Sequence, residues 1–528
     1  MKGRETLNEV TNQMKLLFSS YDTRELSWKE KQLDNLLEML EDHRSEWIQA
    51  IRDDFNLPSD NSFAWNEFET CVEEVKYMKR HVKSLQQDES FFVRASWYPA
   101  QLENRKDPHG LVLIVPSWNF PMQQLVLPLA GALACGNVCV VKVCELARNV
   151  SQKFVELIAK HFEGNCVTCV ESDVSTDDLF SQCKFDFVFY GGFSRQVAKS
   201  IAKHAAEELT PFNINLNNHT IGIKSPLIVD EYLNVKVACK RIAFSKFQNS
   251  GQLGTSPDYI LLDCHIAEEF IDTLISTIKE MYGEDPSHHT KMISHHFTQQ
   301  CQTIIQQSED KIIYGGRVDT AHDLVEPTLI LNPDTENDLV MIQDFTGPIL
   351  PIIIYGEMKG GEKYGSILPT IEACLELIDK QANGSPCMTL FIFSKDGRFV
   401  DYVTDKSRAG HVHINECVSH MAEKAFRNVN GDYDSSVMKE LVACFSHNKP
   451  VIRKKFWLDS SERYLNYNMA ERKVSKRAFN TTSSVHQLQN MLEDTSLPAG
   501  DKVWNLLCLV FTLFMGYVLA LVNKFMFM

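Results

Sequence analysis

The pattern that most constrains the fold is an alternation of short apolar runs with helical stretches, which occurs twice along the chain. Residues 27–84 show the apolar spacing of three to four positions that is typical of amphipathic helices. The apolar runs that follow are bounded by turn residues and separated by helical stretches, which favours parallel, doubly wound sheets. The first series is 111–115, 138–143 and 185–190, and the second is 259–262, 311–314, 349–355, 388–393 and 411–414. We therefore predict two α/β units, each with its own sheet.

The composition is that of a folded acidic protein. At 44% hydrophobic and 23% charged residues, 528 positions suit two or three globular domains, or one large α/β catalytic unit with appendages. The formal net charge of −16 argues against a nucleic-acid partner, whose binding surface would require a basic stripe. The 15 cysteines form no regular framework and favour a reducing compartment. Cys166 and Cys169 form a lone C-x-x-C, which we interpret as buried strand thiols because a second metal-binding pair is missing.

The C-terminal end carries an apolar stretch, 503–522, that is interrupted only by Asn505, Thr512 and Gly516. It is long enough to cross a bilayer core, so we predict a C-terminal transmembrane helix. A buried core helix is the alternative, although few soluble helices are apolar on all sides over this length. The N-terminus has no apolar signal-peptide segment, so a single C-terminal span would leave all preceding residues in the cytosol. Residues 456–502 are polar and predict a linker, whose cations alternatively contact anionic headgroups.

The most specific motif lies between the two apolar series. Residues 249–259 read N-S-G-Q-L-G-T-S-P-D-Y and resemble the nucleophile loop of class 3 aldehyde dehydrogenases, which read close to N-S-G-Q-x-C-x-x-P-D-Y. The resemblance extends, in the same order, over residues 20–455. The segments that carry it are 116–121 (P-S-W-N-F-P), 141–145 (V-K-V-C-E), 209–218 (L-T-P-F-N-I-N-L-N-N), 326–328 (E-P-T), 343–348 (Q-D-F-T-G-P), Asn415 and 445–447 (F-S-H).

The resemblance implies an aldehyde dehydrogenase-like α/β fold, with a Rossmann-type dinucleotide-binding domain, an α/β catalytic domain and, in this chain, a C-terminal transmembrane helix. The implied organisation is an N-terminal helical region at 1–84, a dinucleotide-binding domain at 85–225, a catalytic-type domain at 226–420, a return or oligomerisation segment at 421–455, the polar linker at 456–502 and the membrane anchor at 503–522.

The same resemblance shows that two catalytic groups are replaced. The family's thiol nucleophile falls at Gly254, and its general base, a glutamate, falls at Asn215. Glycine cannot attack a carbonyl, and an amide cannot accept a proton at neutral pH. Asn119 keeps the position of the oxyanion donor, with a turn-capping asparagine as the alternative reading.

Few residues offer a substitute nucleophile. The hydroxyls of Thr255 and Ser256 have no adjacent base in the sequence to activate them. We place Cys264 at the end of the following strand, out of reach, and Cys417 at the rim of the substrate site. Two histidine pairs, 288–289 and 295–296, lack supporting ligands and predict a solvated loop and a helix start, so we predict no metal site.

The cofactor positions are partly kept. Lys142 and Glu145 fall where the family binds the adenosine ribose, with exposed charges at a strand end as the alternative. Gly192 falls in the turn that opens the phosphate-facing helix. Asp344 replaces the glutamate that holds the nicotinamide ribose, one methylene shorter. NAD or NADP binding is therefore expected to be weak or absent.

Three functions remain open at this point. The first is a membrane-anchored pseudoenzyme with a binding or scaffolding role, as a homodimer or as a heterodimer with an active class 3 paralogue. The second is an active NAD(P)-dependent oxidoreductase for long-chain aldehydes, and the third is a lipid- or nucleotide-sensing module. The resemblance to membrane-bound fatty-aldehyde members implies the endoplasmic reticulum membrane, or another internal membrane, with the folded part facing the cytosol.

Overall fold

The computed structural model describes most of the chain up to residue 454. The described residues are 7–57, 62–87, 89–91, 100–162, 166–192, 194–214, 224–253, 256–283, 290–357, 360, 363–417 and 441–454. The chain divides into two compact units, Met1–Gln86 with Asp107–His447, and Gln87–Lys106 with Asn448–Met528.

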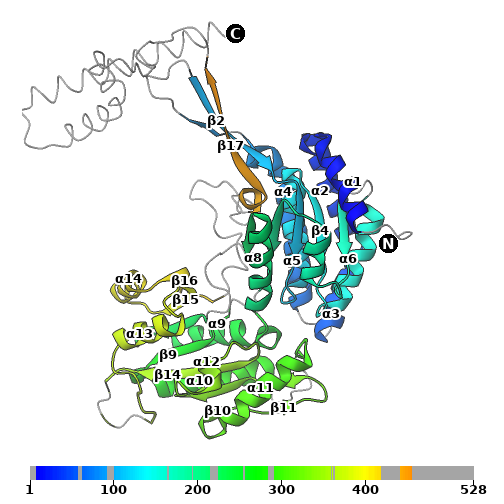
Figure 1. The fold of residues 1–528 in the computed structure, drawn as a ribbon. Coiled ribbons are helices and arrows are strands. Elements are labelled where there is room, and N and C mark those ends of the chain that lie inside the picture. Colours follow the sequence, from blue (N-terminus) through cyan, green and yellow to red (C-terminus); the bar gives the residue numbers. More distant parts are fainter. Residues whose placement is uncertain are drawn as a thin grey trace, which may run out of the picture. The chain divides into compact units, whose positions relative to one another are not determined.

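Four helices open the larger unit and confirm the helical prediction for residues 27–84. They are α1 (Leu7–Ser19), α2 (Leu26–Glu41), α3 (Arg44–Phe55) and α4 (Ser62–Leu85). The apolar face of α2 is buried because α2 packs on α4 and on α5 (Pro121–Cys135). Helix α3 packs on α6 (Arg148–His161). Helix α6 lies beside α5 in Figure 1. These contacts join the N-terminal helices to the core of the first sheet.

The first sheet has five strands in the order β5-β4-β3-β6-β7, and all neighbouring pairs are parallel. Every residue of β3 is buried, because helices cover both faces of a doubly wound sheet. Three of the five strands were predicted from their apolar runs. The strands are β3 (Leu111–Val115), β4 (Val138–Lys142), β5 (Val167–Val170), β6 (Phe187–Tyr190) and β7 (Phe212–Ile214), with α7 (Thr176–Gln182) and α8 (Arg195–Glu208) between them.

The second sheet has seven strands in the order β10-β13-β14-β9-β8-β15-β16. Its pairs are parallel except that β10 runs antiparallel to β13. The strands are β8 (Pro226–Val229), β9 (Tyr259–Asp263), β10 (Ile312–Tyr314), β13 (Thr328–Leu331), β14 (Ile349–Tyr355), β15 (Cys387–Phe393) and β16 (Ala409–Ile414); a hairpin of β11 (Val318–Asp319) and β12 (Leu324–Val325) stands apart. The helices are α9 (Val235–Phe247), α10 (Ala267–Tyr282), α11 (His295–Gln307), α12 (Leu339–Ile342), α13 (Ile371–Gln381) and α14 (Gly397–Lys406). The two-sheet architecture is therefore as predicted.

The smaller unit contains a sheet that the sequence did not predict. Its three strands have the order β1-β2-β17 and are β1 (Glu89–Phe91), β2 (Ala100–Pro108) and β17 (Ser446–Lys454). Figure 1 shows β2 beside β17, although more than three hundred residues separate them in the chain. The reason for the missed sheet is composition: β2 reads A-Q-L-E-N-R-K-D-P, without the apolar alternation that marks a strand.

Within the part of the chain that the structure describes, no helix has both the length and the apolar character needed to cross a membrane. The stretch 503–522, for which the sequence predicts a transmembrane helix, lies outside the described residues.

Candidate functional site

The structure describes five of the seven predicted site residues. Asn119, Lys142, Glu145, Gly192 and Asp344 are described, and all belong to the larger unit. Asn215 and Gly254, which the sequence analysis predicts to replace the base and the nucleophile, lie outside the described residues.

Asn119 lies between β3 and the start of α5 and is only 2% exposed. Its Oδ1 atom has no hydrogen-bond partner among the described residues. A buried amide oxygen without a partner is energetically costly, and such atoms are concentrated at functional positions. The structure thus keeps the amide of the oxyanion position inside the protein.

A buried carboxyl group that the sequence analysis missed holds the segment after Asn119. Glu67 of α4 accepts hydrogen bonds at Oε1 from the backbone N–H groups of Met122 (2.7 Å) and Gln123 (3.3 Å). These are free N–H groups at the start of α5, where a carboxylate is favoured. Burial nevertheless raises the pKa of Glu67 to about 8. The only signal in the sequence was a charged residue on the apolar face of α4.

The loop formed by residues 249–253, here named the nucleophile-type loop, has an unusual backbone. Asn249 (φ 50°) and Ser250 (φ 53°) are left-handed, and Gly251 follows with φ 66°. A left-handed conformation is disfavoured for residues other than glycine and persists only where the surroundings impose it. The loop therefore requires an external support.

Residues 290–293 supply that support. Ser250 Oγ donates to the Thr290 carbonyl, and Gln252 Nε2 donates to the carbonyls of Lys291 (3.1 Å) and Asn249 (3.0 Å). The backbone N–H of Ile293 donates to Gln252 Oε1 at 2.8 Å. Gln252 is 1% exposed, so these bonds are shielded from water. The loop that precedes Gly254 in the sequence is thus fixed by residues 290–293.

The same loop packs on the segment 343–348. A Cβ atom on Gly251 would lie 2.3 Å from the Gly347 carbonyl oxygen, so only glycine fits this position. Phe345 of that segment lies under two lysine side chains, with its ring centroid 4.9 Å from Lys224 Nζ and 5.9 Å from Lys246 Nζ. The nucleophile-type loop is therefore closely packed on the segment 343–348.

Both lysines have a lowered pKa because burial disfavours the charged ammonium. Lys224 Nζ donates to the carbonyls of Val340 and Gln343, both at 3.0 Å. It therefore fixes the backbone just before Asp344. The sequence analysis did not single out either lysine.

The structure corrects the assignment of Cys417 to the rim of the site. Cys417 is fully buried in the hydrophobic cluster of the second sheet, and burial raises the pKa of its thiol well above the usual value. The error arose because Cys417 lies only two residues beyond the Asn415 motif, whereas its side chain packs into the core. Cys264 follows β9 directly, as predicted.

Ten other described thiols give little thiolate. Burial also raises the pKa of the thiols at Cys71, Cys139, Cys144, Cys166, Cys169, Cys239, Cys301, Cys374, Cys387 and Cys444. The thiolate is the attacking species, so a protonated buried thiol is a poor nucleophile. Cys166 is buried and Cys169 half-buried beside and within β5, in agreement with the interpretation as strand thiols.

Two of the four cofactor positions, Lys142 and Gly192, have internal contacts. Lys142 is half-buried and its Nζ donates to the Ser172 carbonyl at 3.2 Å. Glu145 and Asp344 are exposed. Gly192 is buried, and a Cβ at this position would lie 2.4 Å from the hydroxyl of Tyr190.

The described residues therefore fit a dinucleotide poorly. The backbone N–H of Ser194, at the start of α8, donates to the hydroxyl of Tyr190 at 3.0 Å, and that of Val197 donates to Ser194 Oγ at 3.4 Å. Phosphate groups bind such N–H groups at helix N-termini, and here two of them already have protein partners.

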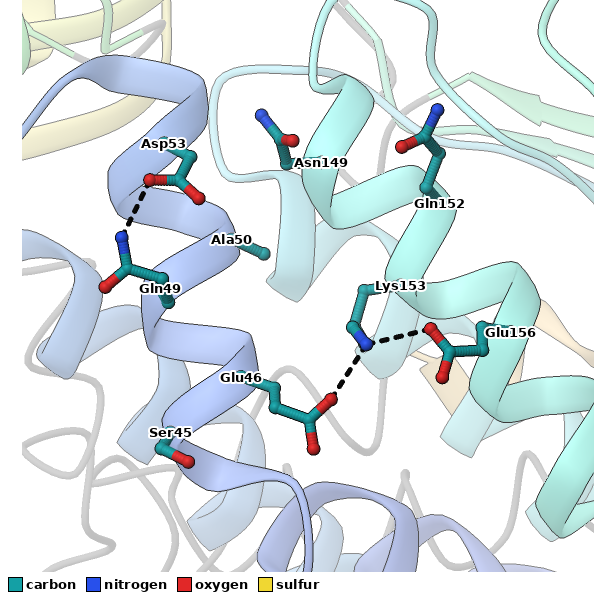
Figure 2. Close-up of a pocket in the computed structure, with 9 residues that line it drawn as sticks. All are labelled: Ser45, Glu46, Gln49, Ala50, Asp53, Asn149, Gln152, Lys153 and Glu156. Atoms are coloured by element: carbon teal, nitrogen blue, oxygen red, sulfur yellow. Dashed lines mark hydrogen bonds and ion pairs between the residues drawn. The ribbon is translucent and has the colours of Figure 1, made fainter.

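The described residues also form a groove away from the predicted site residues. It is an open groove of about 500 Å³ between α3 and α6, and Figure 2 shows Lys153 placed between Glu46 and Glu156 in it. None of the predicted site residues lines this groove. Its exposed, mostly polar lining does not match the concave, largely apolar sites that bind small molecules.

One group of possible metal ligands also lies in the described part of the chain, at Asp263, Cys264 and His265. Asp263 Oδ1 accepts hydrogen bonds from the backbone N–H of His265 and lies 2.8 Å from its Nδ1. These contacts form the cap of a short helical turn. The group is explained by local structure.

The chain matches the model of the aldehyde dehydrogenase family over residues 1–437. It is 28% identical over 411 residues to 4,4'-diaponeurosporen-aldehyde dehydrogenase of Staphylococcus aureus, a match that covers 77% of this chain and 84% of that protein. It is also 28% identical over 448 residues to mouse aldehyde dehydrogenase family 3 member A2, with coverage of 83% and 86%.

Solved structures share the fold. The substrate-bound AldH of S. aureus superposes with a TM-score of 0.78 at 24% identity and covers 90% of this chain and 100% of its own. Succinic semialdehyde dehydrogenase of Streptococcus pyogenes, in complex with NADP+, gives a TM-score of 0.69 at 20% identity and coverage of 84% and 94%.

Proposed function

This chain belongs to the aldehyde dehydrogenase family, and we propose that it retains the family's fold but has lost aldehyde oxidation and acts by binding. The observation that carries the proposal is the double replacement at Gly254 and Asn215. Oxidation of an aldehyde on this fold needs a thiolate to add to the carbonyl and a base to activate water for release of the acid. Two independent roles are missing, and restoring either one alone would leave the cycle incomplete.

The burial of most of the described thiols supports the proposal. Cys417, the one thiol that the sequence placed near the site, is a protonated core residue. The buried amide of Asn119 and the fixed nucleophile-type loop are compatible with binding of a carbonyl compound without a covalent step.

The proposed function includes a second protein chain. Strand β16 ends the second sheet, and large apolar side chains are exposed on or near it and on α9: Tyr232, Val237, Phe244 and Ile414. An exposed strand edge beside apolar side chains suits pairing with another chain. We expect a homodimer, or a heterodimer with an active class 3 relative, and Ile414→Asp should shift the mass measured by light scattering toward the monomer.

The proposed location is an internal membrane, with a single C-terminal span at 503–522. The charge-free apolar stretch supports this, and the endoplasmic reticulum is the expected membrane. Deletion of residues 503–528 should move the protein from the membrane fraction to the soluble fraction. Retention of the shortened chain in the membrane fraction would contradict the anchor.

An active oxidoreductase for long-chain aldehydes is the second candidate, because relatives of 27–28% identity carry dehydrogenase names. The discriminating experiment measures NADH or NADPH formation by the purified full-length chain with a long-chain aldehyde. The Gly254→Cys/Asn215→Glu double variant and the S. aureus relative serve as comparators. We expect no turnover above background from the unaltered chain, and turnover equal to the relative would refute the proposal.

A further inference from the structure

The turn that joins β6 to α8 is described at residues 190–192 and 194, and these four residues are here named the phosphate turn. Tyr190 is the last residue of β6, Gly191 and Gly192 follow, and Ser194 precedes the first residue of α8. In a doubly wound fold, this is the place where helix N–H groups point outward and bind phosphate. A diphosphate ligand can bind there only if these N–H groups are not already bonded to protein side chains.

The side chain of Tyr190 folds back onto its own turn. Its hydroxyl accepts a hydrogen bond from the Ser194 N–H at 3.0 Å and donates to the Ser194 carbonyl at 3.3 Å. The ring lies against Gly192, at whose Cβ position the nearest atoms are Tyr190 Oη, Cζ and Cε2 at 2.4–2.6 Å. Tyr190 is 4% exposed, and burial raises its pKa to about 12, so the hydroxyl keeps its proton at neutral pH. Both hydrogen bonds are therefore available at once.

A second side chain covers the neighbouring glycine. The Oε1 atom of Gln124, from α5, lies 2.1 Å from the position of a Cβ on Gly191. This oxygen is a hydrogen-bond acceptor, as phosphate oxygens are, so it cannot bind them. The two glycines that would allow a ligand close to the backbone are thus covered from inside the protein.

We propose that Tyr190 is an internal cap of the phosphate turn, which excludes diphosphate-containing ligands from the α8 N-terminus. The proposal deepens the proposed function, because a chain without turnover has no need of a nicotinamide cofactor. The Tyr190 hydroxyl satisfies the N–H group that a diphosphate oxygen would take, and a ligand must break that bond before it can bind. A nucleoside without phosphates makes no use of this N–H group and is not affected.

The test measures binding without any aldehyde, so it is independent of turnover. Adenosine diphosphate and adenosine are titrated calorimetrically into the full-length chain, into Tyr190→Phe and into Tyr355→Phe. Tyr355 is the matched control, because it is also buried and its hydroxyl donates to a backbone carbonyl, that of Val229, at 3.3 Å. Loss of the Tyr190 hydroxyl frees the Ser194 N–H for a charge-assisted hydrogen bond, which corresponds to about a tenfold gain in affinity.

For the unaltered chain, we expect adenosine diphosphate to bind no tighter than adenosine. Tyr190→Phe should bind adenosine diphosphate about tenfold tighter than the unaltered chain and leave adenosine unchanged. Tyr355→Phe should change neither. Unchanged or weaker binding of adenosine diphosphate by Tyr190→Phe would contradict the proposal that Tyr190 caps the turn. An equal gain in affinity for adenosine would contradict it as well.

A measurement on the unaltered protein covers the case in which Tyr190→Phe does not fold. The backbone N–H of Ser194 should be protected from hydrogen exchange without ligand, because Tyr190 holds it. Exchange at the rate of a free amide would contradict the proposal. Aldehyde turnover by the unaltered chain would refute the proposed function instead, and the two failures remain distinguishable.

Discussion

The nucleophile-type loop and the phosphate turn have opposite kinds of support. The loop is fixed from outside, by Ser250 and Gln252 bonded to residues 290–293 and by Gly251 packed on Gly347. Within the turn, the hydroxyl of Tyr190 bonds to the backbone N–H and carbonyl of Ser194. The conformation of residues 249–253 is therefore set by bonds to other segments and does not depend on the side chain at position 254.

The energies agree with this picture. Each left-handed residue other than glycine costs about 1 kcal/mol or more, and each net hydrogen bond returns about 0.5–1.5 kcal/mol. The loop has two such residues, Asn249 and Ser250, and four side-chain hydrogen bonds that offset them. Changes in the loop should therefore cost more stability than changes in the turn.

The largest effect is expected for Gly251→Ala. Its Cβ would meet the Gly347 carbonyl oxygen at 2.3 Å and the carbonyl carbon at 2.5 Å, on a backbone with φ 66°. We expect a loss of about 5 kcal/mol in the free energy of unfolding, measured in urea. Gly397→Ala is the control, because nothing lies within 4 Å of its Cβ position. A loss below about 1 kcal/mol would show that the loop is not fixed on Gly347.

The burial of Glu67 should make the free energy of unfolding depend on pH. The pKa of Glu67 is raised from 4.5 to about 8, so between these values the folded state holds a proton that the unfolded state releases. This contribution is complete below pH 4.5 and is lost as pH rises through about 8. It amounts to about 5 kcal/mol, and Glu67→Gln should remove it. Parallel pH profiles of the unaltered chain and the variant would contradict the assignment.

Removal of the Gln252 side chain breaks three buried hydrogen bonds, to Asn249, Lys291 and Ile293. We expect Gln252→Ala to lower the free energy of unfolding by about 3 kcal/mol, because its backbone partners lose their hydrogen bonds and water does not replace them. Gln381→Ala is the matched control, since Gln381 makes a single bond to the Thr335 carbonyl. Equal losses from the two variants would remove the distinction between a fixed loop and an ordinary surface segment.

The smallest effect is expected in the phosphate turn. Tyr190→Phe keeps the ring and removes only the hydroxyl, so the unfolding free energy should fall by about 1 kcal/mol. A loss as large as that of Gln252→Ala would mean that the turn is as strongly supported as the loop, and the comparison would fail.

Much of the fold followed from periodicity. The runs at 111–115 and 349–355 coincide with β3 and β14, since buried parallel strands are continuously apolar. Strands β5 and β8 are four residues long and gave no distinct run. The pairing of β2 with β17 is non-local, and neither strand has a buried face that a pattern could show.

The site was predictable in its residue types but not in its contacts. Motif positions located Asn119 and the loop from 249 onward, whereas Glu67 lies on a separate helix, with no motif to mark its role. The position of the Tyr190 hydroxyl depends on the conformation of the turn, and the burial of Cys417 depends on which way its side chain points. Such directions are properties of the folded chain.

The central claim is that this chain has no residue that takes an acyl group. It is tested most directly by intact-protein mass spectrometry after incubation with an activated long-chain ester, which acylates a thiolate without any nicotinamide. With asparagine at position 215, an adduct once formed would hydrolyse slowly and persist. We predict an unmodified mass for the unaltered chain and one added acyl group at position 254 in Gly254→Cys. A stoichiometric acyl adduct at one residue of the unaltered chain would contradict the claim.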